Sequence, residues 1–540
     1  MVSSTSAAYD AAIDAPVRRT VATVGFDLAA PEAKRLAALT VPPENEFSRA
    51  GQLLNNIEEI GAPIATFEPG QWRLDGSFVL PVPPGETDYE LGWWGRDMSG
   101  GDGLLPVPYA LDIAFPVVQK IPSLGLAFDT KGNCAMADFA VSFYGSDDVL
   151  LYSESFAGNT NCTVQTTGGA EQTRRIRVEM TRTAVPYRFP RICEISFGLR
   201  LRFDGADLIK TSLVTEGDPT GESIPFPRLR VTVRNDGRFN FLENEDMSKY
   251  LQNRQAFEYH HGVILPDGGR EMVYGGAYYL EGWRVSDERI EFDAAGASSV
   301  LENTMCDLRD FATVTVGTLA ELILAGSGLS FDIDESLYES PPVCAYLGET
   351  SARQALTGVA KLGCALVYEN RQNTIRVQDM LAAGAAADTI DYDNMLAPPV
   401  LTQSPYYNGV TLTEYTARTG TDGFDRADVF YPAPWYDATE QAYGCPVDLP
   451  CMVVNRNPQY EVFRAWFLER KFALLSRRIT AEAEWRQNPA LCVGDTVVVQ
   501  ADKRGQRVNA CTIYNTLEYA GGVLSGTTRA LLLAKGVEMV

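Results

Sequence analysis

Residues 479–485 read ITAEAEW, and this stretch decides the fold class because every second residue in it is apolar. Such an alternation puts the apolar side chains on one face of a β-strand, as in a half-buried sheet. A turn at residues 487–489 follows, and the Val-rich run 496–500 reads as the returning strand. The apolar spacing from Pro458 to Ser476 predicts one long helix before these strands.

Turn-forming residues recur over most of the chain, which contains 46 Gly and 30 Pro. Short apolar stretches such as Arg228–Val233 lie between these turns, and they predict many short strands. Residues 297–395 differ: helical spacing at 319–325 and 351–362 is followed by a hairpin pattern at 365–377. The sequence therefore predicts a mainly β protein that contains one small α+β unit.

A chain of 540 residues is well beyond the roughly 250–300 residues at which one hydrophobic core stops growing, so several domains are expected. The Pro- and Gly-rich segment 216–227 is the clearest linker. The predicted division is an N-terminal arm or subdomain at 1–70, a jelly-roll-like β-sandwich extension at 71–210, a β region at 211–300, a small α+β domain at 301–396, and a second β region with one long helix at 397–540.

The charge balance argues against sequence-specific binding of nucleic acid. The chain has 46 Lys and Arg against 70 Asp and Glu, a formal charge of -24. Affinity for phosphate comes mostly from basic side chains that displace counterions, so such an acidic surface repels DNA. The longest apolar runs, such as 319–324, are far shorter than the roughly 20 residues that span a bilayer, so we expect no membrane-spanning segment.

Catalytic and cofactor motifs are missing from the sequence. The two histidines, His260 and His261, are adjacent, and neighbouring residues of a strand point to opposite faces, so their imidazoles should not converge on one metal. No Gly-x-Ser-x-Gly elbow and no phosphate-binding Gly-x4-Gly-Lys loop occurs. We therefore expect no catalytic residue, metal or cofactor, and no enzyme activity.

Ten cysteines are scattered without a CxxC pair, which indicates mostly buried thiols. Cys445 and Cys451 are the one pair close enough in sequence to form a disulfide. An oxidising environment would favour that bond and a reducing cytoplasm would oppose it. Whether it forms stays open at this point.

Two groups of residues are candidate binding sites. Trp93 and Trp94, with Asp97 and Asp102, lie in a Gly-rich stretch of the expected sandwich. Aromatic faces beside carboxylates are typical of glycan recognition, although large aromatic residues more often pack in a core.

The second group lies in the aromatic, proline-rich segment 430–436. Its residues Tyr431, Trp435 and Tyr436 are of the types enriched at the buried centres of interfaces. They predict a contact with another subunit or another protein, with a loop folded onto its own domain as the alternative.

Four sequence strings follow one another in the second part of the chain. They are Glu216-x-Asp218-Pro219 with Leu229–Val233, Gly275–Trp283 with Ile290–Ala294, Ala320–Ser330 with Ala352–Gly363 and Tyr368–Val377, and Glu484-Trp485-x5-Leu491-x2-Gly494-Asp495-x-Val497-x-Val499. In this order they resemble the baseplate hub and tail-tip structural proteins of tailed bacteriophages and related contractile particles. The resemblance covers roughly 60% of the chain and excludes residues 1–203.

The resemblance implies that 211–300 and 397–540 form two hub-type β-barrels flanking the α+β domain. It also implies a homotrimer whose six barrels form a ring that matches the tail tube. The expected partners are tail tube, distal tail and fibre proteins, with genomic DNA passing through unbound. The expected location is the virion tail tip or baseplate, after assembly in the host bacterial cytoplasm.

Two other functions stay open. The first is a receptor- or glycan-binding tail protein that acts on host surface glycan through the sandwich. The second is a glycoside hydrolase that uses two carboxylates, which would need them about 5 to 9.5 Å apart in a cleft.

Overall fold

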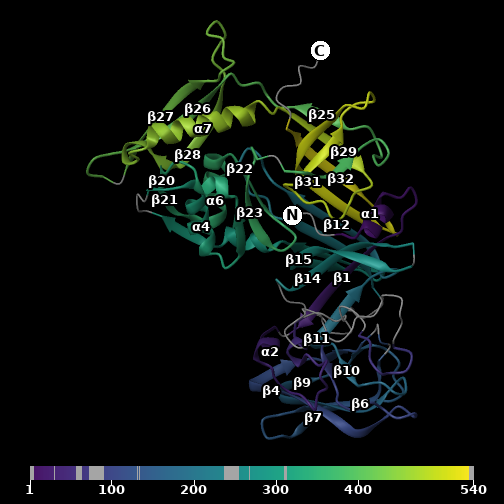
Figure 1. The fold of residues 1–540 in the computed structure, drawn as a ribbon. Helices are drawn as coiled ribbons and strands as arrows, with labels where there is room; N and C mark the ends of the chain where they lie inside the picture. Colours follow the sequence, from purple (N-terminus) through teal and green to yellow (C-terminus); the bar gives the residue numbers. More distant parts are fainter. Residues whose placement is uncertain are drawn as a thin grey trace. The chain divides into compact units, whose positions relative to one another are not determined.

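The computed structural model of the chain divides into two compact units (Figure 1). Unit 1 comprises Met1–Gly25 and Arg202–Val540, and unit 2 comprises Phe26–Leu201. The structure describes residues 5–29, 31–55, 64–71, 91–129, 132, 134–235, 254–266, 268–308, 313–382, 384–421 and 423–533. The chain passes from one unit to the other within β1 (Thr20–Ala29) and within β11 (Glu194–Phe203).

The predicted N-terminal arm, 1–70, is not a body of its own. Residues 1–25 belong to unit 1 and residues from 26 onward to unit 2. The reason is helix α1 (Ala7–Asp14), whose Tyr9 and Ile13 are buried against Val263 and Val273 of unit 1. The remaining predicted domain boundaries stay predictions.

The largest sheet of unit 1 has the strand order β25-β29-β32-β31-β12-β13-β16-β15-β14-β1, with β30 beside β31 and β24 beside β30. The bounds of its strands after β1 are β12 Leu208–Glu216, β13 Arg228–Arg234, β14 Ala256–Ile264, β15 Arg270–Val285, β16 Arg289–Ala295, β24 Ala386–Ile390, β25 Val400–Gln403, β29 Ile479–Trp485, β30 Thr496–Gln500, β31 Arg507–Ala520 and β32 Val523–Leu532. The alternation in residues 479–485 is confirmed: Ala481, Ala483 and Trp485 are buried while Glu482 and Glu484 are exposed.

The expectation of two separate closed barrels is wrong for the part of the chain that the structure describes. Strand β12, from the first predicted barrel, pairs with β31, from the second, in the register Lys210↔Ala520 to Glu216↔Tyr514. The same β12 pairs with β13 on its other edge. Both edges of β12 are therefore used, and the two regions form one continuous sheet that does not close over the described residues.

The α+β part of unit 1 follows the sequence prediction closely. Helix α6 (Ala352–Gly363) begins after Ser351, whose side chain accepts a hydrogen bond from the Gln354 backbone N–H, and it ends at Cys364 in the left-handed conformation. Strands β22 (Ala365–Glu369) and β23 (Thr374–Asp379) form the predicted antiparallel hairpin. The other elements of this part are η2 Ala297–Glu302, β17 Met305–Leu308, β18 Thr313–Val314, α4 Val316–Ala325, β19 Ser330–Ile333, α5 Glu335–Tyr338, β20 Val343–Cys344 and β21 Leu347–Ser351.

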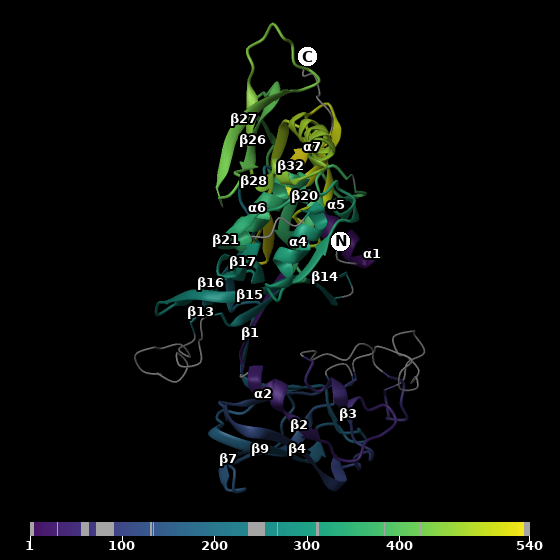
Figure 2. The ribbon, with the colours of Figure 1, turned by 90° about the vertical axis from the view of Figure 1, so that its left-hand side faces the viewer.

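The predicted long helix is α7 (Tyr460–Leu475), which packs on a three-stranded sheet. Figure 2 shows this sheet, with β26 (Gly409–Ala417) between β27 (Phe424–Pro432) and β28 (Gly444–Val453). Phe463 and Phe467 of α7 are fully buried in the same core as Val410 and Leu412 of β26. The short helix η3 (Val454–Arg456) connects β28 to this helix.

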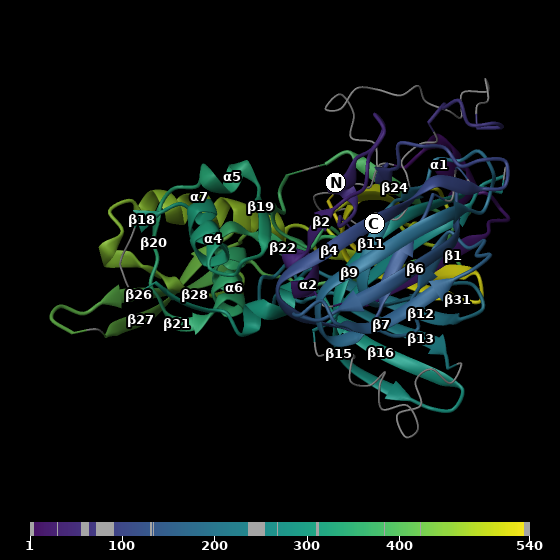
Figure 3. The same ribbon diagram turned by 90° about the horizontal axis from the view of Figure 1, so that it is seen from below.

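Unit 2 is a β-sandwich, as predicted for this region. One sheet has the order β2-β4-β9-β6-β7, which can be followed in Figure 3, and the other contains β11, β5 and β8. Side chains of both sheets, among them Val141, Val178, Leu126 and Ile195, share one core. The elements of unit 2 after β1 and besides β11 are α2 Pro31–Leu36, β2 Ala38–Thr40, η1 Ala50–Gln52, β3 Trp93–Trp94, β4 Leu104–Ile121, β5 Leu124–Ala127, β6 Met136–Tyr144, β7 Leu150–Phe156, β8 Thr163–Gln165, β9 Ala170–Thr183 and β10 Arg191–Ile192.

Candidate functional site

Trp93 and Trp94 lie inside unit 2. Both indoles are 0% exposed, and β3, which carries them, pairs with β10. The Trp93 Nε1 donates to the Pro42 carbonyl at 3.3 Å, and the Trp94 Nε1 donates to the Leu91 carbonyl at 2.8 Å. A sugar ring cannot reach either aromatic face, so the glycan-stacking role predicted for the two tryptophans is wrong.

A buried ionic cluster occupies the space next to Trp94. The Arg191 guanidinium pairs with the carboxylates of Glu68 and Asp129, and all three residues are at most 2% exposed. Glu68 also accepts hydrogen bonds from the Phe189 backbone N–H at 2.8 Å and from the Thr66 hydroxyl at 2.6 Å. The cluster fixes the loop around residue 68 to the strands of the sandwich.

The two predicted aspartates have different surroundings. Asp97 is engaged internally, because its carboxylate accepts a hydrogen bond from the Tyr109 hydroxyl at 2.6 Å. Burial, together with that bond, raises the pKa of Tyr109 to about 12. Asp102 is exposed, and one of its oxygens accepts a hydrogen bond from the Leu104 backbone N–H. Asp102 is therefore the more accessible of the two aspartates, because Asp97 is only partly exposed.

Tyr187 is an exposed aromatic residue close to Asp102 that the sequence prediction missed. It is 49% exposed, and its backbone has a φ of 56°, in the left-handed region that non-glycine residues rarely adopt. Its hydroxyl lies against Gly101, where an added Cβ would be 2.7 Å from the Tyr187 Oη. No periodicity of the sequence marks this position, because the loop conformation alone exposes it.

Trp435 and Tyr436 belong to a partly exposed group of aromatic residues in unit 1, which we name the aromatic surface. Its members are Tyr406, Tyr407, Trp435, Tyr436 and Tyr443. Three of them are well exposed: Tyr406 at 44%, Trp435 at 37% and Tyr443 at 57%. The rings of Tyr407 and Tyr443 stack with their centroids 5.3 Å apart, and the Trp435 Nε1 donates to the Tyr407 carbonyl at 3.1 Å.

A buried asparagine holds the two loops of the aromatic surface together. Asn408, 2% exposed, has its backbone N–H donating to the Tyr443 carbonyl, and its side-chain oxygen accepts the Tyr443 backbone N–H at 2.6 Å. Its side-chain N–H donates to the Gln441 carbonyl at 2.9 Å, and its carbonyl accepts the Ala433 backbone N–H. The aromatic side chains are therefore presented by a fixed backbone.

Tyr431, the third residue predicted for this contact, points to its own domain. Its hydroxyl donates to Glu414 of β26 at 2.6 Å and accepts from the Arg464 Nη1 of α7 at 3.2 Å. Burial and the bond to Glu414 raise its pKa. Of the three predicted interface residues, the structure groups Trp435 and Tyr436 in the aromatic surface and places Tyr431 apart from them.

The histidines diverge, as the strand geometry predicts. The His261 ring packs on Tyr259 at 4.2 Å, whereas the His260 ring packs on Tyr274 at 5.2 Å. Burial, then the nearby charge of Arg371, lowers the pKa of His261 to about 3, so this imidazole is neutral at physiological pH.

Cys445 is a free, partly exposed thiol. The Cys451 side chain lies outside the described residues, and so does the open question of a Cys445–Cys451 disulfide.

An acidic cleft of about 440 Å³ is lined by Asp14, Asp388, Asp391 and Asp393, among other residues. Burial, then the charges of Asp14 and Asp10, raises the pKa of Asp388. Over the described ranges, no three His, Cys, Asp or Glu residues come together in a group that could hold a metal ion.

The helices of that same part of the chain are each too short or too polar to cross a membrane.

No protein-family model matches the sequence, and no curated protein matches it. Among solved structures, the chain is similar to the 43 kDa tail protein of prophage MuSo2 from Shewanella oneidensis, at 13% identity and a TM-score of 0.40 over 61% of this chain and 95% of that one. It is similar to a tail protein from Neisseria meningitidis, at 12% identity and a TM-score of 0.41 over 61% and 93% of the two chains. A third is the prophage tail protein gp18 from Listeria monocytogenes, at 11% identity and a TM-score of 0.38 over 62% and 92%. The solved structures named here are tail proteins, and the sequence resembles the same class.

Proposed function

We propose that this protein is a structural component of a phage tail tip or baseplate, in which three copies form a hub that closes or extends the tail tube and anchors other tail proteins. The order of elements in unit 1 carries this proposal. The sequence resemblance implies β strands, then an α+β part with two helices and a hairpin, then strands with one late helix. Unit 1 has these elements in that order, with α7 followed by the strands β29 to β32.

The turn between β29 and β30 gives the resemblance a physical basis. Gly494 of the Gly494-Asp495 turn has a φ of 87°, and an added Cβ there would lie 2.2 Å from the Tyr368 hydroxyl of β22. Only glycine combines this conformation with this close approach. The motif therefore joins the last β region to the α+β hairpin.

The charge of the chain suits a conduit for DNA. A formal charge of -24 repels phosphate, so DNA can pass a wall made of such subunits without adhering to it. We propose the virion tail as the location, with assembly in the host bacterial cytoplasm.

We assign the contact between subunits, or with another tail protein, to the aromatic surface. Tyr and Trp side chains that a fixed backbone holds partly exposed are of the type that forms the energetic centre of an interface. Asn408 provides that fixed backbone, so Trp435 and Tyr436 lose little conformational freedom on binding.

The test is the mass of the full chain in solution, alone and mixed with the tail tube protein. The proposal expects three copies, or rings with the tube protein, and Trp435→Ala should weaken that assembly at least tenfold. Tyr338→Ala is the matched control, because Tyr338 on α5 has the same exposed fraction, 37%, and lies outside the aromatic surface. A monomer that does not associate with any tail protein contradicts the proposal.

A second candidate function is glycan binding by unit 2, and the position of Tyr187 favours it. Its exposed ring lies next to the Gly-rich turn that carries Asp102, which places an aromatic face and a free carboxylate on one loop surface. Binding of the full chain to a glycan array, lost in Tyr187→Ala but kept in Phe67→Ala, would support it. Phe67 is a suitable control because it is the most exposed aromatic residue among the described residues of this unit, at 96%.

We further propose that the protein has no enzyme activity. The rival function, a carboxylate glycosidase, requires turnover of polysaccharide. Incubation of the full chain with host-wall polysaccharide should release no new reducing ends, and release that is lost in Asp388→Asn or Asp391→Asn would establish the rival.

A further inference from the structure

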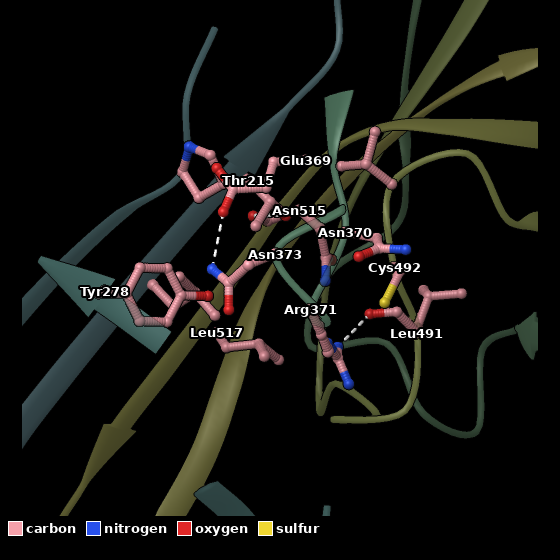
Figure 4. A pocket seen from close by; sticks show the side chains of 13 residues that line it. Thr215, Tyr278, Glu369, Asn370, Arg371, Asn373, Leu491, Cys492, Asn515 and Leu517 are labelled. Carbon is pink, nitrogen blue, oxygen red and sulfur yellow. Dashed lines mark hydrogen bonds between the residues drawn. The ribbon is translucent and has the colours of Figure 1, made fainter. Parts of the chain in front are cut away.

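The cavity where the turn between β22 and β23 meets the large sheet of unit 1 is too small for a ligand (Figure 4). Its volume is about 10 Å³, which is space for one water molecule. The Arg371 Nη2 donates to the Leu491 carbonyl there, and the Asn373 side chain donates to Glu369 at 2.8 Å. The exposed residues of unit 1 therefore offer more to a partner than this cavity does.

An exposed apolar segment, residues 396–400, leads into β25 and reads Leu-Ala-Pro-Pro-Val. Leu396 is 56% exposed and Val400 is 62% exposed, and Ala397 and Pro398 are exposed as well. The two consecutive prolines hold the backbone of the segment in an extended conformation. Segment 396–400 is therefore stiff and apolar, and the described part of the chain leaves it uncovered.

A free negative charge lies beside this segment, on Asp393. Asp393 is exposed, and among the described residues its carboxylate forms no ion pair. The neighbouring Asp391 differs, because it pairs with Arg507 at 3.3 Å. The apolar side chains of segment 396–400 are thus flanked by a carboxylate that is available to a cation.

Arg478 brings the opposite charge to the edge of the aromatic surface. Its Cζ lies 5.2 Å from the centroid of the Tyr406 ring, and its Nε and Nη2 donate to the Ser404 carbonyl at 3.3 and 3.0 Å. Within the described ranges this guanidinium forms no ion pair. A guanidinium has five N–H donors, so it can also bind a carboxylate that a partner supplies.

In one molecule the segment and the aromatic surface lie at opposite ends of β29. The Leu396 backbone N–H donates to the Glu484 carbonyl, and the Ser404 backbone N–H donates to the Arg478 carbonyl, each at 2.8 Å. Residues 478 and 484 are about 20 Å apart along an extended strand, at about 3.3 Å per residue. Segment 396–400 therefore does not reach the aromatic surface of its own molecule.

We propose that the aromatic surface of one copy binds segment 396–400 of a second copy, with Arg478 of the first copy paired with Asp393 of the second. This inference rests on the proposed trimer and names the contact that builds it. Exposed Tyr and Trp rings are surfaces on which proline-rich segments pack, because a stiff segment loses little conformational freedom when it binds. The two surfaces differ, so each copy offers one of them to each neighbour, and a head-to-tail contact of this kind closes into a ring.

The experiment measures the mass of the full chain in solution, alone and with the tail tube protein, for variants with exchanged charges. Arg478→Glu and Asp393→Arg should each weaken the assembly about tenfold, because each places like charges at the contact. The double variant carries the same pair in reverse and should restore the assembly. Arg418→Glu is the control that should leave it unchanged, since Arg418 is exposed and pairs with Asp425 at the other end of β26 and β27 from the aromatic surface.

A photo-crosslink gives the second measurement, and it decides if a charge variant does not fold. A chain with benzoylphenylalanine in place of Tyr443, mixed with isotope-labelled chain, should form crosslinks from one copy to segment 396–400 of another. A trimer that does not respond to Arg478→Glu, or whose crosslinks map elsewhere, would overturn this inference and leave the proposed hub standing. A chain that stays monomeric alone and with the tube protein would overturn both.

Discussion

The Arg191 guanidinium lies over the Trp94 indole, with its Cζ 3.7 Å from the ring centroid. This contact covers a face of the buried Trp94 ring, while Trp93 packs in the core of unit 2. The ring face that a sugar would need is covered by a cation, and that cation is in turn held by Glu68 and Asp129. Aromatic residues beside charges can thus indicate a ligand site or a buried ionic cluster, and here they form the cluster.

Arg191→Gln should destabilise unit 2 by about 3–5 kcal/mol, because it leaves two buried carboxylates without their cation. Chemical denaturation followed by tryptophan fluorescence measures the loss. Arg182→Gln is the control: its ion pair with Asp138 is 3.6 Å long and half exposed, so less than about 1 kcal/mol should be lost. Equal losses in the two variants would show that the cluster does not stabilise the fold.

Trp93→Ala should lower the free energy of unfolding by about 3–5 kcal/mol, since the side chain is part of the unit 2 core. Tyr187→Ala should change it by less than about 1 kcal/mol, because half of that side chain is exposed. A comparison of the two variants therefore distinguishes an effect on the folding of unit 2 from an effect on glycan binding. A stable Trp93→Ala protein with altered glycan binding would restore the original prediction for the tryptophans.

Gly494→Ala should be strongly destabilising. The positive φ costs about 1–2 kcal/mol for any residue with a Cβ, and the contact with the Tyr368 hydroxyl adds a steric clash. Gly505→Ala, with a φ of 86° and open space around its Cβ, should show the conformational cost alone. Thermal midpoints of the two variants give the comparison, and a smaller drop for Gly494→Ala would contradict the close approach.

Asp379 gives the fold an acid-sensitive contact. Burial alone would raise its pKa, but the bonds from Arg470, the Leu381 N–H and Ser336 lower it overall. A carboxyl with a lowered pKa stabilises the fold above its unfolded pKa, and this contribution is lost as the pH falls through its folded value.

Arg470→Gln should therefore cost about 3 kcal/mol at neutral pH and progressively less below about pH 4. Urea denaturation at a series of pH values measures the effect. Arg507→Gln is the control. The Arg507 guanidinium, which pairs with Asp391, is exposed, so this variant should lose little stability over the same pH range. A loss from Arg470→Gln that stays constant with pH would exclude Asp379 as the titrating partner.

Asp388→Asn should stabilise unit 1 at neutral pH. The pKa of Asp388 is raised by burial and by Asp14 and Asp10, so its ionised form is unfavourable in the folded state. The gain should shrink as the pH falls toward the range where Asp388 is protonated in the folded protein. The midpoint of thermal unfolding checks this, and a loss of stability at neutral pH would contradict it.

Elements with strong local signals could be predicted from the sequence. The cap at Ser351, the hairpin at 365–377 and the helix at 460–475 depend on residues close together in the chain, and the structure has each of them. The alternation in residues 479–485 likewise set the buried face of β29.

The long-range features could not be read from such patterns. The pairing of β12 with β31 joins Thr215 and Asn515, which are 300 residues apart, and no local spacing encodes it. The aromatic surface was found in part: the aromatic, proline-rich loop indicated Trp435, but Tyr443 joins it through the hydrogen bonds of Asn408 and by stacking on Tyr407. Arg371 looked like an ordinary turn residue, and its burial depends on the strands that surround it.

The position of β12 between β13 and β31 constrains synthesis of the protein. When β12 and β13 leave the ribosome, the other edge of β12 has no partner until residues 507–520 have been translated. Until then the nascent chain exposes a row of free backbone groups, which is a template for pairing with a foreign strand. Slow translation of the last segment, or a premature stop before it, should therefore favour aggregation of the unfinished chain.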